Sequence, residues 1–142
     1  MDRKSWLSLL ATANADQLNR LFDASEYTNQ IKVLRHPEIG TVMARGRMGG
    51  TGDSFNFGEI TVTRCSIELN DVQGHGYVQG RDKDQSLATA ILDALLQTDA
   101  ASELLEKVIK PIQEAKITRE HSIKEKSEAT RVDFFTRVRG ED

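Results

Sequence analysis

The chain has 142 residues, the usual size of one domain, and can bury one hydrophobic core. Hydrophobic residues make up 38% of it, charged residues make up 29%, and the formal net charge is −3. This mildly acidic balance argues against nucleic-acid binding, which requires a basic excess. The sequence has no apolar run long enough to span a membrane and no signal-peptide pattern after Met1. We therefore expect a cytoplasmic protein that binds neither nucleic acid nor membranes.

Two short helices are expected at the N-terminus. Apolar residues at spacings of three and four predict a helix over residues 3–13. Asn14 has the character of an N-cap for a second helix, and the segment from Asp23 to Tyr27 interrupts the helical pattern. The pattern predicts a helical hairpin with one shared apolar side.

A sheet region follows, with strands expected at about residues 31–34, 41–48, 57–69 and 75–81. The segment His36-Pro37-Glu38-Ile39-Gly40 predicts a turn between the first two strands, since proline fixes φ and glycine permits a reversal. The apolar residues of the third strand change phase, which indicates either a β-bulge near Arg64 or burial on both faces. Short connections favour antiparallel pairing.

Helices are expected again after the sheet. Asp82 and Gln85 resemble a capping box at the start of a helix over about 84–97. A further helix covers 101–109, and Pro111 marks its end or a kink.

Charges at four-residue spacing then predict a solvated helix with ion pairs within residues 112–130. We predict an α+β fold with a mainly antiparallel sheet of about four strands, an N-terminal helical hairpin and C-terminal helices. Residues 1–130 form one domain in this prediction, and 131–142 form an apolar and basic tail.

The segment with the clearest chemical character is Arg45-Gly46-Arg47-Met48-Gly49-Gly50-Thr51-Gly52. Arginine binds phosphate and carboxylate through two parallel donors, and consecutive backbone N–H groups can form a nest for an anion. The alternative is a hairpin tip that needs glycine for its turn. The segment is neither a P-loop nor a Rossmann fingerprint, because no helix follows it. The candidate ligand- or partner-binding residues are Arg45, Arg47, Gly49, Gly50, Thr51, Gly52 and Arg81.

Arg81 and Asp82 lie where a strand ends and a helix begins, a common place for ligand contacts. The structural alternatives are that Asp82 caps the helix and that Arg81 pairs with a neighbouring acid. In the tail, apolar residues return after a polar spacer, which is typical of a segment that docks on its own domain or on a partner. The partner-docking candidates are Val132, Phe134, Phe135, Arg137, Val138 and Arg139.

Residues that usually carry redox or metal chemistry are few. Cys65 is the single cysteine, so no internal disulfide is possible, and its apolar strand pattern predicts a small buried side chain. His36, His75 and His121 lack the paired spacing of a zinc site. We expect no metal site and no cofactor bound by this chain, and no motif identifies a catalytic residue.

Three parts of the chain together resemble the PhnG family, the G subunits of the bacterial carbon–phosphorus lyase system. These are the block Arg47-Met48-Gly49-Gly50-Thr51-Gly52, the triplet Gly80-Arg81-Asp82, and the tail from Arg131 to Gly140. Their order, spacing and chain length agree with the family, so the resemblance covers nearly the whole chain. The N-terminal helices and residues 112–128 match it only in general character.

The resemblance implies a cytoplasmic machine that lets bacteria use phosphonates as a phosphorus source. In it, the G subunit works with the H, I and L proteins to replace the adenine of ATP with methylphosphonate. The product is α-D-ribose 1-methylphosphonate 5-triphosphate, with MgATP and phosphonate as substrates of the complex. G also belongs to a stable core assembly with H, I and J. The resemblance therefore implies a transferase subunit that is inactive by itself. Because isolated subunits of complexes often expose apolar patches, we also expect that a homodimer can form in the absence of partners.

Three hypotheses remain open on the sequence. The chain is an accessory subunit that docks through its tail, or it contacts substrate through Arg45 and Arg47. Without the family, it is a stand-alone anion-binding or self-associating module with no catalytic role.

Overall fold

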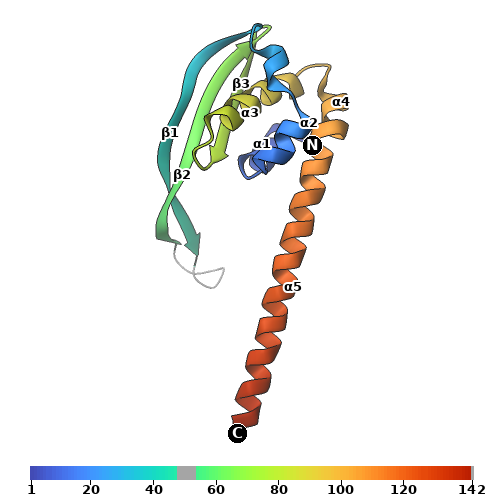
Figure 1. The fold of residues 1–142 in the computed structure, drawn as a ribbon. Coiled ribbons are helices and arrows are strands. Elements are labelled where there is room, and N and C mark those ends of the chain that lie inside the picture. The colour runs from blue at the N-terminus through green and yellow to red at the C-terminus, as the bar shows by residue number, and fades with distance from the viewer. Residues whose placement is uncertain (48–53, 142) are drawn as a thin grey trace. The chain divides into compact units, whose positions relative to one another are not determined.

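The computed structural model describes residues 1–47 and 54–141, and the chain divides into two units, Met1–Ile112 and Gln113–Asp142 (Figure 1). The helices of the first unit are α1 (Arg3–Ala11), α2 (Ala15–Leu21), the 3-10 turn η1 (Ala24–Tyr27), α3 (Lys83–Leu96), α4 (Ala101–Leu104) and the π turn η3 (Leu105–Ile109). Its strands are β1 (Ile31–Arg47), β2 (Ser54–Leu69) and β3 (Val72–Gln79). Helix α5 (Lys110–Glu141) begins in the first unit and makes up the second.

Side-chain caps fix where the helices of the first unit begin. The carboxylate of Asp2 accepts a hydrogen bond from the backbone N–H of Ser5, and the Asn14 side chain accepts one from Gln17. The predicted N-cap at Asn14 is therefore confirmed, although α1 ends at Ala11, before the predicted residue 13.

The sheet is antiparallel in the order β1-β2-β3, so the α+β class is confirmed, and the described residues hold three strands rather than about four. The expected turn at residues 36–40 is absent, because β1 runs through it without a break. Pro37 is tolerated there because β1 is an edge strand, where a missing N–H need not break a ladder. A register shift between Arg35 and Glu38 marks a bulge at the proline, and another between Val33 and Arg35 marks a bulge just before it.

The apolar phase change within β2 falls where two adjacent residues are both buried. β2 itself pairs with β3 without a register shift from Val62 to Leu69. Val62 and Thr63 are adjacent, and both are buried, so the strand is covered on both faces at this point. The second of the two sequence-based alternatives is therefore confirmed. β2 turns into β3 through Asn70 and Asp71, whose φ angles of 48° and 66° belong to a two-residue hairpin turn.

Two glycines let α3 approach β3 more closely than any side chain would permit. A Cβ at Gly74 would lie 1.9 Å from the carbonyl oxygen of Ala90, and one at Gly76 would lie 1.9 Å from that of Ser86. The helix backbone thus lies directly on the strand. Helices α1, α2 and α3 all lie on the same side of the sheet (Figure 1).

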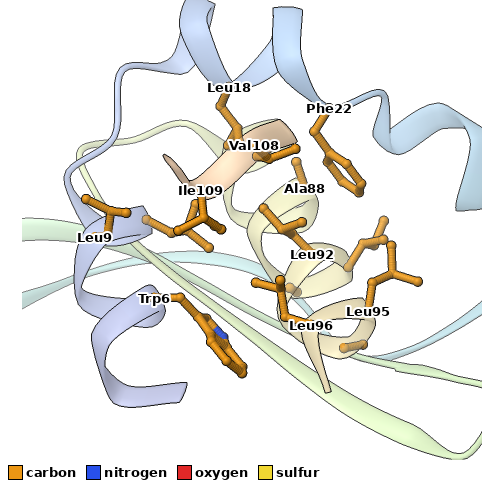
Figure 2. Packing of buried hydrophobic residues seen from close by; sticks show 14 of the residues in the cluster. Trp6, Leu9, Leu18, Phe22, Ala88, Leu92, Leu95, Leu96, Val108 and Ile109 are labelled. Carbon is orange, nitrogen blue, oxygen red and sulfur yellow. The ribbon is translucent and has the colours of Figure 1, made fainter. Parts of the chain in front are cut away.

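The hydrophobic core fills the space between these helices and the sheet. Leu92 of α3 is fully buried, and it lies among side chains from α1, α2 and η3 in Figure 2. The labelled partners in that view include Trp6, Leu9, Leu18 and Ile109. The first turn of α5 contributes Ile112, which is 1% exposed. Burial of such side chains is the main favourable contribution to folding.

A buried carboxylate connects three elements of this core. Asp93 of α3 is fully buried, and each of its oxygens accepts two hydrogen bonds. Arg3 donates from Nε and Nη2 over 3.2 and 2.8 Å. Trp6 donates from Nε1 over 2.8 Å, and the backbone N–H of His75 in β3 donates over 2.9 Å. The charge is thereby paired and fully hydrogen-bonded, and the carboxylate in turn raises the pKa of Arg3.

The proline near the start of α5 interrupts the α-helical hydrogen-bond pattern without ending the helical run. Lys110 donates its backbone N–H to the carbonyl of Leu105, five residues back, as in a π turn. Pro111 then occupies the first turn of α5, where its lack of an N–H is tolerated.

The second unit is a helix with a charged surface. Lys116 lies 4.0 Å from Glu120, and His121 lies 2.9 Å from Glu125, each four residues apart. Ile123 is 65% exposed. The predicted solvated helix with ion pairs is confirmed, and the backbone of residues 131–141 continues it. Within the ranges described, no helix is long and apolar enough to cross a membrane.

We expect Gly76→Ala to lower the free energy of unfolding by about 3 kcal/mol or more, or to prevent folding, because the new Cβ would collide with the α3 backbone. Gly40→Ala is the matched control, since nothing lies within 4 Å of a Cβ there. That variant should change stability by less than about 0.5 kcal/mol. Urea denaturation followed by circular dichroism measures both, and equal midpoints would contradict the close packing.

We expect Asp93→Ala to lower the free energy of unfolding by about 2–4 kcal/mol, because it leaves the indole of Trp6 and the N–H of His75 without an acceptor. Asp99→Ala, at an exposed turn, should change it by less than about 0.5 kcal/mol. Urea titrations of the two variants test this. If Asp93→Ala were as stable as Asp99→Ala, the carboxylate would have no structural role.

Candidate functional site

The sheet face opposite α3 carries a cluster of polar and basic side chains. In the register of the sheet, Arg35, Ser66 and His75 form one row across β1, β2 and β3. Glu38, Arg64 and Tyr77 form the next row. Residues directly opposite in an antiparallel pair point to the same face, with Cβ atoms about 5 Å apart.

A hollow of about 320 Å³ lies among these side chains, and we call it the basic hollow. Its lining residues are Arg35, Arg64, Cys65, Ser66, His75, Gly76 and Tyr77. Two guanidinium groups, a hydroxyl, an imidazole and a phenol therefore converge on one depression of the sheet.

The bulges in β1 decide which side chains reach this face. Without the first bulge, the pairing of Val33 with Ile67 would continue, and Leu34 would lie opposite Ser66. The extra residue places Arg35 there instead, since a one-residue shift moves a side chain to the other face. The bulge between Val33 and Arg35 therefore brings an arginine into the basic hollow.

The charges of the basic hollow are only partly compensated. Arg35 lies 3.4 Å from Glu38, and both side chains are more than half exposed, so this ion pair is weak. For Arg64, no carboxylate lies within ion-pair distance among the side chains that the structure describes. Two arginines against one carboxylate leave this part of the surface positive although the whole chain is acidic.

The Ser66 hydroxyl and the Nδ1 atom of His75 are 2.9 Å apart. If the imidazole accepts this hydrogen bond, its Nε2–H remains free to donate, and if it donates, the hydroxyl proton remains free. In both tautomers one donor is left for a ligand. In the part of the chain described, no carboxylate orients the imidazole, unlike in a Ser-His-Asp triad. The pair therefore suits binding better than nucleophilic catalysis.

A second hollow, of about 350 Å³, lies beside η1 and the start of α3. Phe22, Leu87 and Ala88 form its apolar part, and Asp23 and Asp84 bring negative charge. Its lining contains no cation, so it does not suit an anionic ligand.

The sequence-predicted glycine block lies mainly outside the described residues. This applies to Gly49, Gly50, Thr51 and Gly52. The backbones of Arg45 and Arg47 are described, and they occupy alternate positions at the end of β1, opposite Asn56 and Ser54.

The other predicted candidates have separate locations. Arg81 is exposed between Gly80 and α3, and no described carboxylate lies within ion-pair distance of it. Asp82 accepts a hydrogen bond from the N–H of Gln85 over 2.9 Å, so its predicted role as N-cap is confirmed. The reciprocal half of the capping box is absent, because the Gln85 amide donates to Ala13 instead. The backbone of the predicted docking residues, Val132 to Arg139, lies in α5.

The histidines and the cysteine do not form a reactive centre in the described residues. His36 lies in β1, His75 in β3 and His121 in α5. No group of three potential ligands in these residues could hold a metal ion. Cys65 is 1% exposed, so the predicted small buried side chain is confirmed, and burial raises the pKa of its thiol to about 11.

Sequence reasoning missed the basic hollow. The expected turn began just after Arg35, so the pattern did not place this arginine on a face of the sheet. Arg64 entered the prediction only as the position of the phase change in the third expected strand. The available signal was the spacing of polar residues at alternate positions, Arg64 with Ser66 and His75 with Tyr77, on two strands joined by a tight turn.

The comparison with known proteins identifies the family. The family model described as "Phosphonate metabolism protein PhnG" matches residues 1–140. A protein of Rhizobium meliloti (strain 1021) is 40% identical over 141 residues, which cover 99% of this chain and 90% of that protein. It is named alpha-D-ribose 1-methylphosphonate 5-triphosphate synthase subunit PhnG. The chain belongs to the PhnG family of phosphonate metabolism proteins, as the sequence motifs indicated.

Proposed function

We propose that this chain is the G subunit of a complex that makes α-D-ribose 1-methylphosphonate 5-triphosphate from ATP and methylphosphonate. The family match over residues 1–140 is the observation that carries the proposal. The 40% identical relative bears the name of that synthase subunit, and the alignment spans nearly all of both chains.

In this proposal the complex is a transferase of the cytoplasm. A phosphonate oxygen forms a bond to C1 of the ribose, and the bond from C1 to adenine breaks, so that adenine leaves with the bonding electrons. MgATP and methylphosphonate are substrates of the complex, and this chain binds no resident cofactor. Its proposed partners in the reaction are the H, I and L proteins. The proposed core assembly consists of this chain with the H, I and J proteins.

An accessory role is favoured over an independent active site. The Ser66–His75 pair is the only hydroxyl–imidazole contact in the described residues, and no carboxylate completes it. N-terminal to Val62, β2 pairs only with β1, and an isolated two-stranded ribbon is marginally stable by itself. This ribbon exposes Val42 and Met43. Contact with other subunits would cover these side chains and stabilise the ribbon.

The chain should be required for adenine release by the complex but inert when alone. Full-length protein is mixed with the H, I and L proteins of the same organism, and adenine release from ATP and methylphosphonate is followed by chromatography. Omission of the chain should abolish release. Release by the isolated chain, or undiminished release without it, would contradict the proposal.

The same reconstitution tests the tail. Deleting residues 131–142 should abolish co-purification with the I protein, because the tail supplies apolar side chains such as Phe134 and Phe135. Removing only Glu141 and Asp142 is the control, since it retains the apolar residues. Circular dichroism checks that both truncated proteins fold. Normal co-purification of the longer deletion would assign docking to another surface, such as the ribbon.

A direct contact with substrate is the second candidate role, and it rests on Arg45 and Arg47 at the end of β1. We expect the double variant Arg45→Ala/Arg47→Ala to slow adenine release by the assembled complex at least about tenfold, since a contact to a charged group is worth about 1.5–3 kcal/mol. Arg20→Ala, on the exposed surface of α2, is the control. Normal turnover by the double variant would exclude this role.

The remaining alternative is a stand-alone anion-binding or self-associating module. A homodimer of the isolated chain is compatible with either proposal, because exposed apolar surface favours association in the absence of partners. Dependence of adenine release on this chain would decide in favour of the subunit.

A further inference from the structure

We propose that the basic hollow on the open face of the sheet is a binding site for a phosphate-class oxyanion. The site stands on the geometry of Arg35, Arg64, Ser66 and His75. The identification of its ligand with a triphosphate or phosphonate substrate rests on the proposed function.

The donors of the basic hollow match the acceptors of a tetrahedral oxyanion. Arginine presents N–H groups in a planar fork that fits two oxygens of one phosphate-class group. Arg35 and Arg64 approach the hollow from neighbouring strands, β1 and β2. The Ser66–His75 pair adds one further donor in either tautomer of the imidazole.

The sheet keeps these donors in place before a ligand binds. Ser66 and His75 lie opposite each other in unbroken register, and Arg64 lies opposite Tyr77 in the next row. Behind His75, its backbone N–H is held by the buried carboxylate of Asp93 over 2.9 Å. The Ser66–His75 pair therefore loses little freedom on binding, which favours affinity.

The volume and the charge both limit the ligand. A hollow of about 320 Å³ is at the lower end of the range for small-molecule sites. It therefore suits one phosphate or phosphonate group with a small substituent, or the end of a polyphosphate chain. Glu38 is the only described carboxylate paired with these arginines, and a ligand can replace it because both members of that pair are exposed.

Isothermal titration of the full-length isolated chain tests the site with three probes at equal ionic strength: tripolyphosphate, methylphosphonate and sulfate. We expect binding of the two phosphorus oxyanions in the millimolar range or tighter. The variant Arg35→Ala/Arg64→Ala should weaken it at least about tenfold. Relative affinities of tripolyphosphate and methylphosphonate distinguish the two possible sources of the ligand. Sulfate binding equal to both would show general anion attraction and overturn a phosphate-class site.

Two controls locate the effect within the chain. Arg20→Ala, on the exposed surface of α2, should bind as the wild type does, and Arg45→Ala/Arg47→Ala, whose arginines lie at the far end of β1, reports separately on the glycine block. Ser66→Ala should weaken binding by a smaller factor than the double arginine variant. Loss of binding in Arg45→Ala/Arg47→Ala, with normal binding in Arg35→Ala/Arg64→Ala, would assign the anion to the glycine block and overturn the proposal.

A second measurement uses the wild-type chain and therefore does not depend on whether the variants fold. In amide NMR spectra of the wild-type chain, titration with the bound probe should shift Ser66, His75 and Tyr77 most strongly. Shifts centred elsewhere, or no binding of any probe, would refute the site.

If Arg35→Ala/Arg64→Ala disrupts subunit assembly and the isolated chain binds no oxyanion, the hollow is a protein interface and the proposal is wrong. Absence of adenine release by the wild-type complex, in contrast, would refute the proposed function alone.

Discussion

The structure of the first unit depends on one buried carboxylate. Asp93 has no solvent exposure, and a charge in that environment is tolerated only when its hydrogen bonds are satisfied. Its donors come from α1 and β3, while the carboxylate itself belongs to α3. Any displacement of these elements would leave a buried charge or a buried indole N–H unpaired. The network therefore favours one arrangement of α1, β3 and α3, of which α1 is far from the other two in sequence.

The Asp93 network and the glycines of β3 both position the backbone of β3 around His75. Gly74 and Gly76 let α3 lie against the strand, and His75 between them donates its N–H to Asp93. The side chain of the same residue belongs to the opposite face, where it contacts Ser66. Because helices cover one face of the sheet, the strands can place polar side chains on the other without burying them. The basic hollow is thus a direct consequence of how the core is packed.

Local patterns predicted much of this fold, since they depend on neighbouring residues. The caps at Asn14 and Asp82, the amphipathic helices and the buried Cys65 were all predictable from spacing and side-chain chemistry. Pro37 misled the strand prediction because its usual effect is a break, whereas an edge strand accommodates it with bulges. The contacts of Asp93 with Arg3 and Trp6 join residues about ninety positions apart, which no local pattern reveals. The basic hollow was missed for the same reason, since it required the register of three strands.

The pair Arg35 and Arg64 and the pair Arg45 and Arg47 lie at different places along the strands β1 and β2. Ten residues separate Arg35 from Arg45, which corresponds to roughly 30 Å of extended strand. A single phosphate group cannot reach both, so the basic hollow and the end of β1 at Arg45 and Arg47 cannot share one small ligand. The chain carries a net charge of −3, and its field is screened beyond about 10 Å at 0.1 M salt, so neither place attracts anions from a distance. Recognition at the hollow must then come from short-range contacts, which only a correctly registered sheet provides.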